Sequence, residues 1–136
     1  MSNDLDQVAK ALTDLMRRAA PDMTVKAAGD RGVHLLAAWD NPLKPGQPMW
    51  FGGVQTMKNY VSYHLMPVYS HAALAATIPP ELKKRMQGKS CFNFKTADPA
   101  LFAELAALTA AGAEAYSKPI VMPTREQWQA QAKPSR

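Results

Sequence analysis

The segment at residues 60–66 constrains the fold most strongly, because its side chains alternate in character with a period of two. Val61, Tyr63 and Leu65 are separated by more polar residues, so one set can face a core while the other faces away from it. A second strand-like run at residues 49–58 comes almost directly before it. Two extended runs with so short a connection predict an antiparallel ribbon.

A helix is expected on each side of this ribbon in the sequence. Residues 4–19 carry apolar side chains at three- and four-residue steps, and Pro21 ends the segment. Asp98 followed by Pro99 is a strong helix-start signal, because aspartate caps backbone N–H groups and proline suits the first helical position. The apolar stripe after it consists of Leu101, Leu105, Leu108, Gly112 and Ala115.

The same rules place the remaining elements. In chain order these are strands at 23–28 and 33–39 around a turn at 29–32, a loop at 40–48, a helical stretch at 67–88 and a strand at 90–95. Residues 40–48 are predicted as a loop because their three prolines lack backbone donors. The expected fold is α+β and two-layered, a mainly antiparallel sheet covered on one face by the N- and C-terminal helices. We expect one domain over residues 1–118 and a tail, 119–136, that packs on or near it.

Composition narrows the class of protein. The chain has 136 residues, 47% of them hydrophobic, which favours a folded domain over disorder. Its single cysteine excludes an internal disulfide, and no long uncharged apolar run or signal peptide is visible, so a cytoplasmic protein without a membrane span is expected. The net charge of +5 comes from scattered basic residues, and the one dense group, Lys83 to Arg85, suits a helix end, so nucleic acid is disfavoured as a partner.

The segment from Trp50 to Tyr116 resembles a bacterial family of small domains known as YdhG-like. The motifs that carry the resemblance are Phe51-Gly52-Gly53-Val54, Lys58-Asn59-Tyr60-Val61-Ser62-Tyr63-His64-Leu65, Leu82-Lys83-Lys84-Arg85-Met86-Gln87-Gly88 and Gly88-Lys89-Ser90-Cys91-Phe92-Asn93-Phe94. The resemblance implies a compact sheet covered by helices, in a shape likened to frataxin, with no known catalytic activity. One branch of the family is similar to an intracellular iron chaperone, so the resemblance implies iron as a possible cargo. The first helix offers carboxylates for it at Asp4, Asp6 and Asp14, accompanied by basic residues.

The Gly52-Gly53 pair is the most unusual local feature, because glycine inside a strand marks a bulge, a bend or a close approach. One interpretation is a bend that wraps the sheet around its helices. The other is a shallow ligand groove, floored by the two glycines. The expected edges of that groove are Trp50, Tyr60, His34 and His64.

His34, His64 and Cys91 all fall on strands, on the side opposite the clearest apolar set. If the strands are neighbours, the three could converge on a soft or borderline metal, although separate sheet histidines and a structural cysteine explain them as well. A Cys91–His64 nucleophilic pair is a third reading. We predict a non-enzymatic binding or chaperone-type domain for an unidentified small ligand or protein partner. The alternatives are an iron-binding chaperone and a cysteine/histidine-dependent enzyme, and an uncovered sheet face could also support a homodimer.

Overall fold

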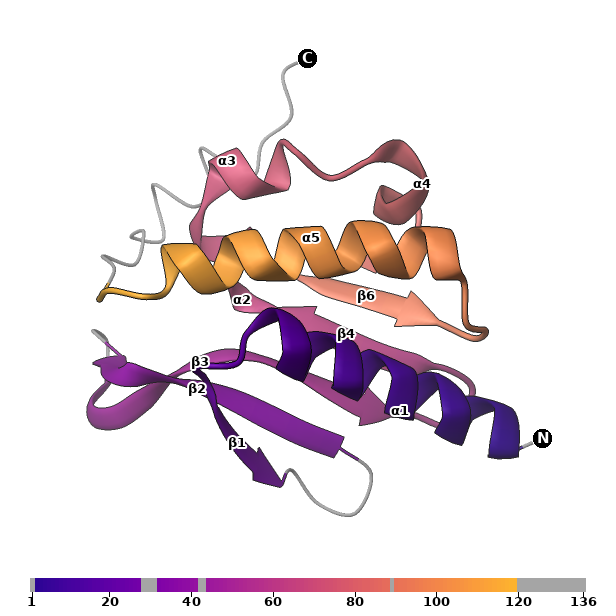
Figure 1. Cartoon of the computed structure of the whole chain (residues 1–136), viewed down its shortest axis with the longest axis horizontal. Helices are drawn as coiled ribbons and strands as arrows, with labels where there is room; N and C mark the ends of the chain where they lie inside the picture. The colour runs from indigo at the N-terminus through magenta and orange to yellow at the C-terminus, as the bar shows by residue number, and fades with distance from the viewer. Residues whose placement is uncertain (1, 28–31, 42–43, 89, 120–136) are drawn as a thin grey trace.

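The computed structural model describes residues 2–27, 32–41, 44–88 and 90–119 of the chain. The elements in chain order are α1 (Ser2–Ala19), β1 (Thr24–Ala27), β2 (Gly32–Asn41), β3 (Lys44–Thr56), β4 (Val61–Leu65), α2 (Met66–Ser70), α3 (Ala72–Ala75), α4 (Pro80–Lys83), β5 (Met86–Gln87), β6 (Cys91–Phe94) and α5 (Pro99–Ala115) (Figure 1). The strands form a single sheet in the order β1-β2-β3-β4-β6-β5, and each neighbouring pair is antiparallel. The predicted α+β class with an antiparallel sheet is confirmed.

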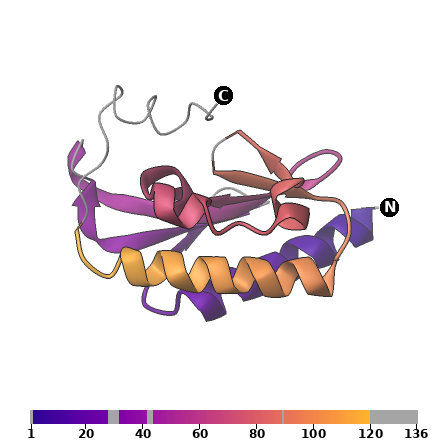
Figure 2. The ribbon, with the colours of Figure 1, turned by 90° about the horizontal axis from the view of Figure 1, so that it is seen from above.

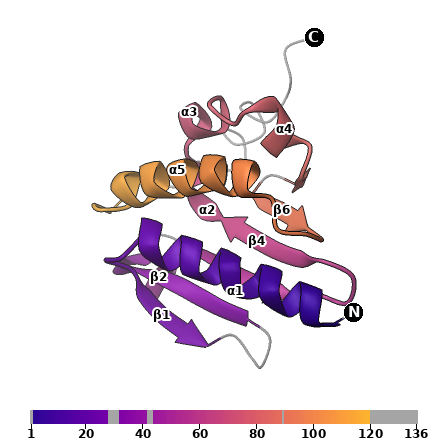
Figure 3. The same ribbon diagram turned by 45° about the vertical axis from the view of Figure 1, so that its right-hand side comes forward.

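The two long helices lie on the same face of the sheet. Seen from above, α1 and α5 run side by side below the strands (Figure 2). In the turned view, α5 lies between α1 and the short helices α3 and α4 (Figure 3). All three short helices contact α5. We call the opposite face of the sheet, turned away from α1 and α5, the distal face.

The core fills the space between the sheet and these two helices. The alternation that predicted the ribbon holds, because Val61, Tyr63 and Leu65 are completely buried. The Tyr63 hydroxyl joins sheet to helix through a 2.6 Å hydrogen bond with the Thr109 hydroxyl of α5. The Asp98 cap is also confirmed, since its carboxylate accepts a hydrogen bond of 3.1 Å from the backbone N–H of Leu101.

The prediction of a loop at residues 40–48 is wrong in part. Strand β2 continues to Asn41, β3 begins at Lys44, and Asp40 pairs with Pro48. The prolines are tolerated because β3 pairs with β4 only over Gly52–Thr56, so this end of β3 has a sheet neighbour on one side only. The ladder here is irregular, and the left-handed Gly46, with φ of 90°, donates its N–H to the Asp40 carboxylate.

The helical stretch expected at 67–88 is broken into three short helices and a strand. Helix α3 ends at Ala75, α4 begins at Pro80 after the N-cap residue Pro79, and α4 ends at Lys83. Met86 falls within the stretch 67–88 that the sequence predicts as helical, but it lies in β5 and pairs with Phe92. The extra strand hydrogen-bonds to the edge of β6, which overrides the local helical spacing. The expected docking of the tail falls on residues 120–136, outside the described residues.

Candidate functional site

A β-bulge at Phe51 arranges the middle of β3. Leu35 pairs with Gly52 and Leu36 pairs with Trp50, so Phe51 is an extra residue that no β2 residue opposes. A bulge of this kind turns two consecutive side chains to the same face. Phe51 is buried against Tyr116 at the end of α5, and a Cβ on Gly52 would lie 3.1 Å from the Met16 side chain of α1. Trp50 and Gly53 are consequently left on the distal face.

Four residues on adjacent strands form one row across the distal face. His34 pairs with Gly53, Gly53 pairs with His64, and His64 pairs with Cys91. Paired residues of an antiparallel sheet project to the same side, so these positions are neighbours on one face. We call His34, Gly53, His64 and Cys91 the cross-strand row. Lys26 of β1 pairs with His34 and Gln87 of β5 pairs with Cys91, so the row extends over all six strands.

The indole ring of Trp50 lies between the two imidazoles of the row. Its ring centre is 5.5 Å from that of His34 and 5.4 Å from that of His64, with tilted planes. Gly53 makes this possible, because a Cβ there would lie 3.0 Å from the His34 ring and 3.6 Å from the Trp50 ring. The indole nitrogen of Trp50 has no solvent exposure and no hydrogen-bond partner among the described residues. Such orphaned donors are rare in folded proteins.

The structure therefore brings five of the seven predicted site residues together and separates two. His34, Trp50, Gly53, His64 and Cys91 share the distal face. Gly52 does not line a groove with Gly53, because the bulge points it toward α1. Tyr60 lies in the turn before β4, where its carbonyl accepts a hydrogen bond from the N–H of Met57, and it is not part of the cross-strand row. The space above Gly53 is occupied by the His34 and Trp50 rings.

Cys91 belongs to a hydrogen-bonded chain of neutral side chains that the sequence analysis did not identify. Its sulfur lies 2.9 Å from the Ser62 hydroxyl, and its thiol donates to the Asn93 carbonyl oxygen at 3.4 Å. The Asn93 amide in turn donates to the Gln87 side chain. The period-two pattern could have indicated these residues, since Ser62 and Asn93 alternate with core positions on β4 and β6.

The electrostatics of the row favour neutral groups. Burial lowers the pKa of His64, and the nearby His34 lowers it further. Burial raises the pKa of the Cys91 thiol, while hydrogen bonds from Ser62 and from the backbone of Tyr63 oppose the shift. Cys91 and His64 are neighbours, but a thiol with a raised pKa forms less of the thiolate that nucleophilic attack requires.

The placement of the side chains does not support the hypothesis that His34, His64 and Cys91 bind a metal ion. Among the described residues, no group of three or more histidine, cysteine, aspartate and glutamate side chains is placed to hold a metal ion. His34 and His64 are separated by the width of β3 and by the Trp50 ring. The iron alternative therefore remains a prediction from the resemblance.

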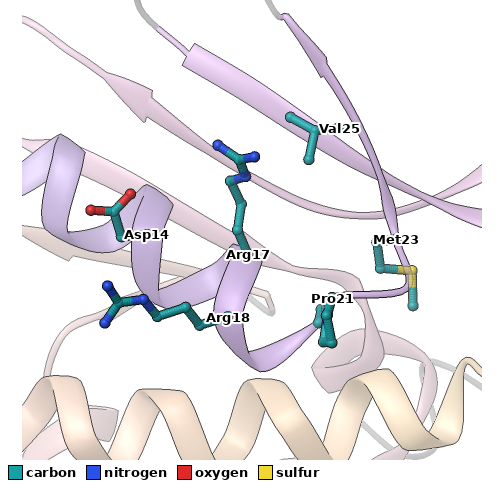
Figure 4. A pocket seen from close by; sticks show the side chains of 7 residues that line it. Asp14, Arg17, Arg18, Pro21, Met23 and Val25 are labelled. Carbon is teal, nitrogen blue, oxygen red and sulfur yellow. The ribbon is translucent and has the colours of Figure 1, made fainter.

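The Asp14 carboxylate of α1 lies near two arginines. A cavity of about 450 Å³ between the end of α1 and β1 is lined by Asp14, Arg17, Arg18, Ala20, Pro21, Met23 and Val25. Figure 4 shows the Arg17 guanidinium extending toward the strand that carries Val25, with Arg18 on the other side of the helix near Asp14. Two arginines in the last turn of a helix are stabilised by the negative end of its dipole, and they reduce the attraction of this surface for iron.

A second polar cluster, which sequence reasoning missed, lies at the junction of α2 and α3. The Ser70 hydroxyl is 2.9 Å from His71 Nδ1 and 2.7 Å from the Tyr116 hydroxyl. The indole N–H of Trp39 donates to the Tyr116 carbonyl at 2.8 Å, and the Trp39 ring lies against that of Tyr116. Burial raises the pKa of Tyr116 to about 12, against a smaller opposite effect of the Ser70 hydrogen bond. This cluster joins α2 and β2 to the end of α5.

No protein-family model matches the chain, and no curated protein or solved structure matches it either. The resemblance to YdhG-like domains consequently stays a prediction. None of the described helices is long and apolar enough to span a membrane.

Proposed function

We propose that the protein is a non-enzymatic binding domain, of the chaperone or ligand-carrier type, that takes a small molecule or a segment of a partner protein on its distal face. The observation that carries this proposal is the indole N–H of Trp50, which has no hydrogen-bond partner within the described ranges of the chain. A buried donor without an acceptor costs about 1–3 kcal/mol, so an orphaned N–H beside two imidazoles supports an acceptor that the chain itself does not supply.

Trp39 provides the comparison within the same chain. Its indole N–H is satisfied by the carbonyl of Tyr116 at 2.8 Å. Both indoles lie on neighbouring strands and both are half-buried. The difference between them supports a structural role for Trp39 and a binding role for Trp50.

The charge of the distal face also supports binding. Along the row that runs from Lys26 through His34, Gly53, His64 and Cys91 to Gln87, Lys26 alone carries a permanent charge. A solvated sheet face normally alternates core residues with charged ones, whereas the centre of a binding surface is depleted of charge and enriched in aromatic rings. Trp50, the two imidazoles and the neutral chain from Ser62 to Gln87 match the second description.

The raised pKa of the Cys91 thiol favours binding over catalysis. An activated cysteine needs a lowered pKa and a base that holds its proton. The described hydrogen bonds of this thiol go instead to Ser62 and Asn93, both neutral.

A fragment screen by nuclear magnetic resonance tests the proposal. A library of small aromatic, carboxylate and peptide fragments is added to ¹⁵N-labelled protein, and backbone and indole shifts are followed. Hits are expected to move Trp50, His64 and Cys91 while leaving Trp39 in place. Hits that map onto α1 and α5, or a screen with no hits at all, would contradict a binding site on the distal face.

A further inference from the structure

Strand β1 leaves one edge of the sheet open. It is the first strand in the order β1-β2-β3-β4-β6-β5, so β2 pairs with it on one side and no strand of the described part of the chain lies on the other. Alternate backbone N–H and C=O groups of an edge strand point away from the sheet, where another strand can pair with them. The strand at the other edge, β5, spans only Met86–Gln87 and is too short to hold a partner.

The open edge borders the cavity between β1 and the end of α1. Val25 lines this cavity and is 41% exposed, although its partner Leu35 is buried. The contacts of α1 with the sheet are mainly to β2, β3 and β4, so β1 lies beyond the cover of the helix. A strand added at the usual spacing of about 4.8 Å would turn every second side chain toward the cavity.

The cavity carries more positive than negative charge. Arg17 and Arg18 line it together with one carboxylate, that of Asp14. Neither arginine forms an ion pair with any residue that the structure describes. Figure 4 shows the Arg17 guanidinium extended toward the strand that carries Val25. A guanidinium placed in this way is suited to a carboxylate that approaches along the edge of β1.

Lys26 puts a further cation at the same edge. It pairs with His34 on the distal face, whereas its neighbour Val25 faces the cavity, so Lys26 and Arg17 stand on opposite sides of the strand. A strand added to β1 therefore meets a cation on each of its two faces. The carboxylate of the cavity and that of Asp22, in the turn before β1, do not balance the three cations.

Charge selects among the segments able to occupy this edge. A second copy of the chain would bring its own Lys26 and arginines to the same place, and like charges across a strand pair are destabilising. Residues 120–136 carry three basic residues and one acidic residue, so the tail of the chain is repelled as well. A lysine on an edge strand is a common protection against self-association, and it attracts an acidic strand.

We propose that β1 binds an extended acidic segment of a partner protein by strand addition, with an apolar side chain against Val25 and a carboxylate on Arg17. The backbone of the segment completes the open edge of the sheet. The apolar side chain enters the cavity beside Met23, and an acidic side chain two positions away on the same face reaches Arg17. The alternate residues face Lys26 and are acidic too. Trp50 takes no part in this site, so the inference goes beyond the proposed function and stands apart from it.

The probe is a capped peptide of seven residues with valine at its centre, two glutamates on each side and threonine at both ends. It is titrated into the ¹⁵N-labelled chain, and the backbone resonances of Thr24–Ala27 and the Nε–H of Arg17 are followed by nuclear magnetic resonance. We expect these signals to shift together. Sodium chloride at about 0.5 M should weaken binding, because exposed ion pairs are screened.

Two matched peptides test the mode of binding. One carries N-methyl groups on alternate backbone nitrogens, which removes the donors that pair with an edge strand. The other has lysine in place of each glutamate. We expect both to bind about tenfold more weakly than the parent peptide or less tightly still, since the first loses the backbone pairing and the second faces like charges.

Two variants separate the contact with Arg17 from the net charge of the chain. Arg17→Gln removes the guanidinium that extends toward β1, and we expect it to weaken peptide binding about fivefold, the upper end for an exposed ion pair. Lys10→Gln removes one charge from an exposed position of the same helix outside this cavity, and binding should stay within about 1.5-fold. Circular dichroism confirms that both variants fold.

Several results overturn the inference. A peptide that leaves the signals of β1 in place shows that the edge does not bind it, and equal losses in Arg17→Gln and Lys10→Gln show an effect of net charge alone. Full binding by the N-methylated peptide excludes strand addition. Signals of β1 that change on dilution without peptide assign the edge to a second copy, and Overhauser contacts between β1 and residues 120–136 assign it to the tail.

Discussion

The indole of Trp50 lies over Gly53, its Cζ2 atom 3.6 Å from where a Cβ of that glycine would stand. The contact exists because the bulge at Phe51 places Trp50 and Gly53 on the same face although three positions separate them. An unbroken strand would put residues 50 and 53 on opposite faces. The aromatic centre of the distal face thus depends on one extra residue in β3.

The first prediction concerns the missing side chain of Gly53. A Cβ there would lie 2.7 Å from the Val33 carbonyl oxygen and 3.0 Å from the His34 ring. Because the backbone oxygen cannot move aside easily, we expect Gly53→Ala to lower the free energy of unfolding by about 1–3 kcal/mol in urea denaturation. Gln55→Ala, at an exposed position of the same strand, is the control and should stay within about 0.5 kcal/mol. Equal stability of both variants would mean that the rings do not pack over Gly53.

The second prediction contrasts the two indoles in stability. Trp39→Phe leaves the Tyr116 carbonyl without its donor, and we expect a loss of about 1 kcal/mol in the free energy of unfolding. Trp50→Phe removes a donor that has no acceptor among the residues the structure describes, so the stability of this variant should stay within about 0.5 kcal/mol of the parent. Urea denaturation monitored by circular dichroism measures both. A larger loss for Trp50→Phe than for Trp39→Phe would show that the Trp50 N–H is already satisfied.

The third prediction concerns the protonation of His64. His34 contributes to lowering its pKa, so His34→Asn should raise the pKa of His64 toward its ordinary value. Titration of the imidazole Hε1 signals by nuclear magnetic resonance measures the change. His71, in the separate cluster with Tyr116, serves as the internal reference and should keep its pKa. An unchanged His64 would show that burial alone shifts it.

The fourth prediction follows from the sign of the same shift. The pKa of His64 is lower in the folded protein than its ordinary value of 6.5, so the unfolded chain takes up the proton first as the pH falls. The stability that neutral His64 contributes is complete above pH 6.5 and is lost as the pH falls toward the folded-state pKa. We expect the urea midpoint to drop between about pH 7.5 and about pH 5.5, and to drop less in His64→Asn. An identical drop in both proteins would assign the pH dependence to other groups, His71 first among them.

The fifth prediction concerns the reactivity of Cys91. Burial raises the pKa of its thiol, so iodoacetamide should alkylate the folded protein more slowly than the same protein unfolded in urea, both at about pH 8. Ser62→Ala removes a hydrogen bond that lowers this pKa, and on that ground we expect still slower alkylation. Mass spectrometry follows the reaction. Faster alkylation of the folded protein than of the unfolded chain would contradict this prediction and would favour the hypothesis that Cys91 and His64 form a nucleophilic pair.

Local sequence pattern predicted most of the helices and strands. Periods of two and of 3.6 residues are set by the backbone alone, so they placed α1, α5 and the ribbon that contains β3 and β4. The same alternation put His34, His64 and Cys91 on the side away from the core, and the structure confirms that placement. It failed at residues 40–48 and at Met86, where pairing with another strand overrode proline content and helical spacing.

By itself, the sequence determined which side chains face the core and which face away, because that choice depends only on neighbours along the chain. Only the tertiary structure decided that His34, Gly53, His64 and Cys91 share one row and that Trp50 reaches it through a bulge. It also decided that the Trp50 indole N–H finds no acceptor in the described part of the chain. These features depend on the register between strands drawn from residues 24–94. Register is selected by the burial and pairing of the whole sheet at once, and no single segment encodes it.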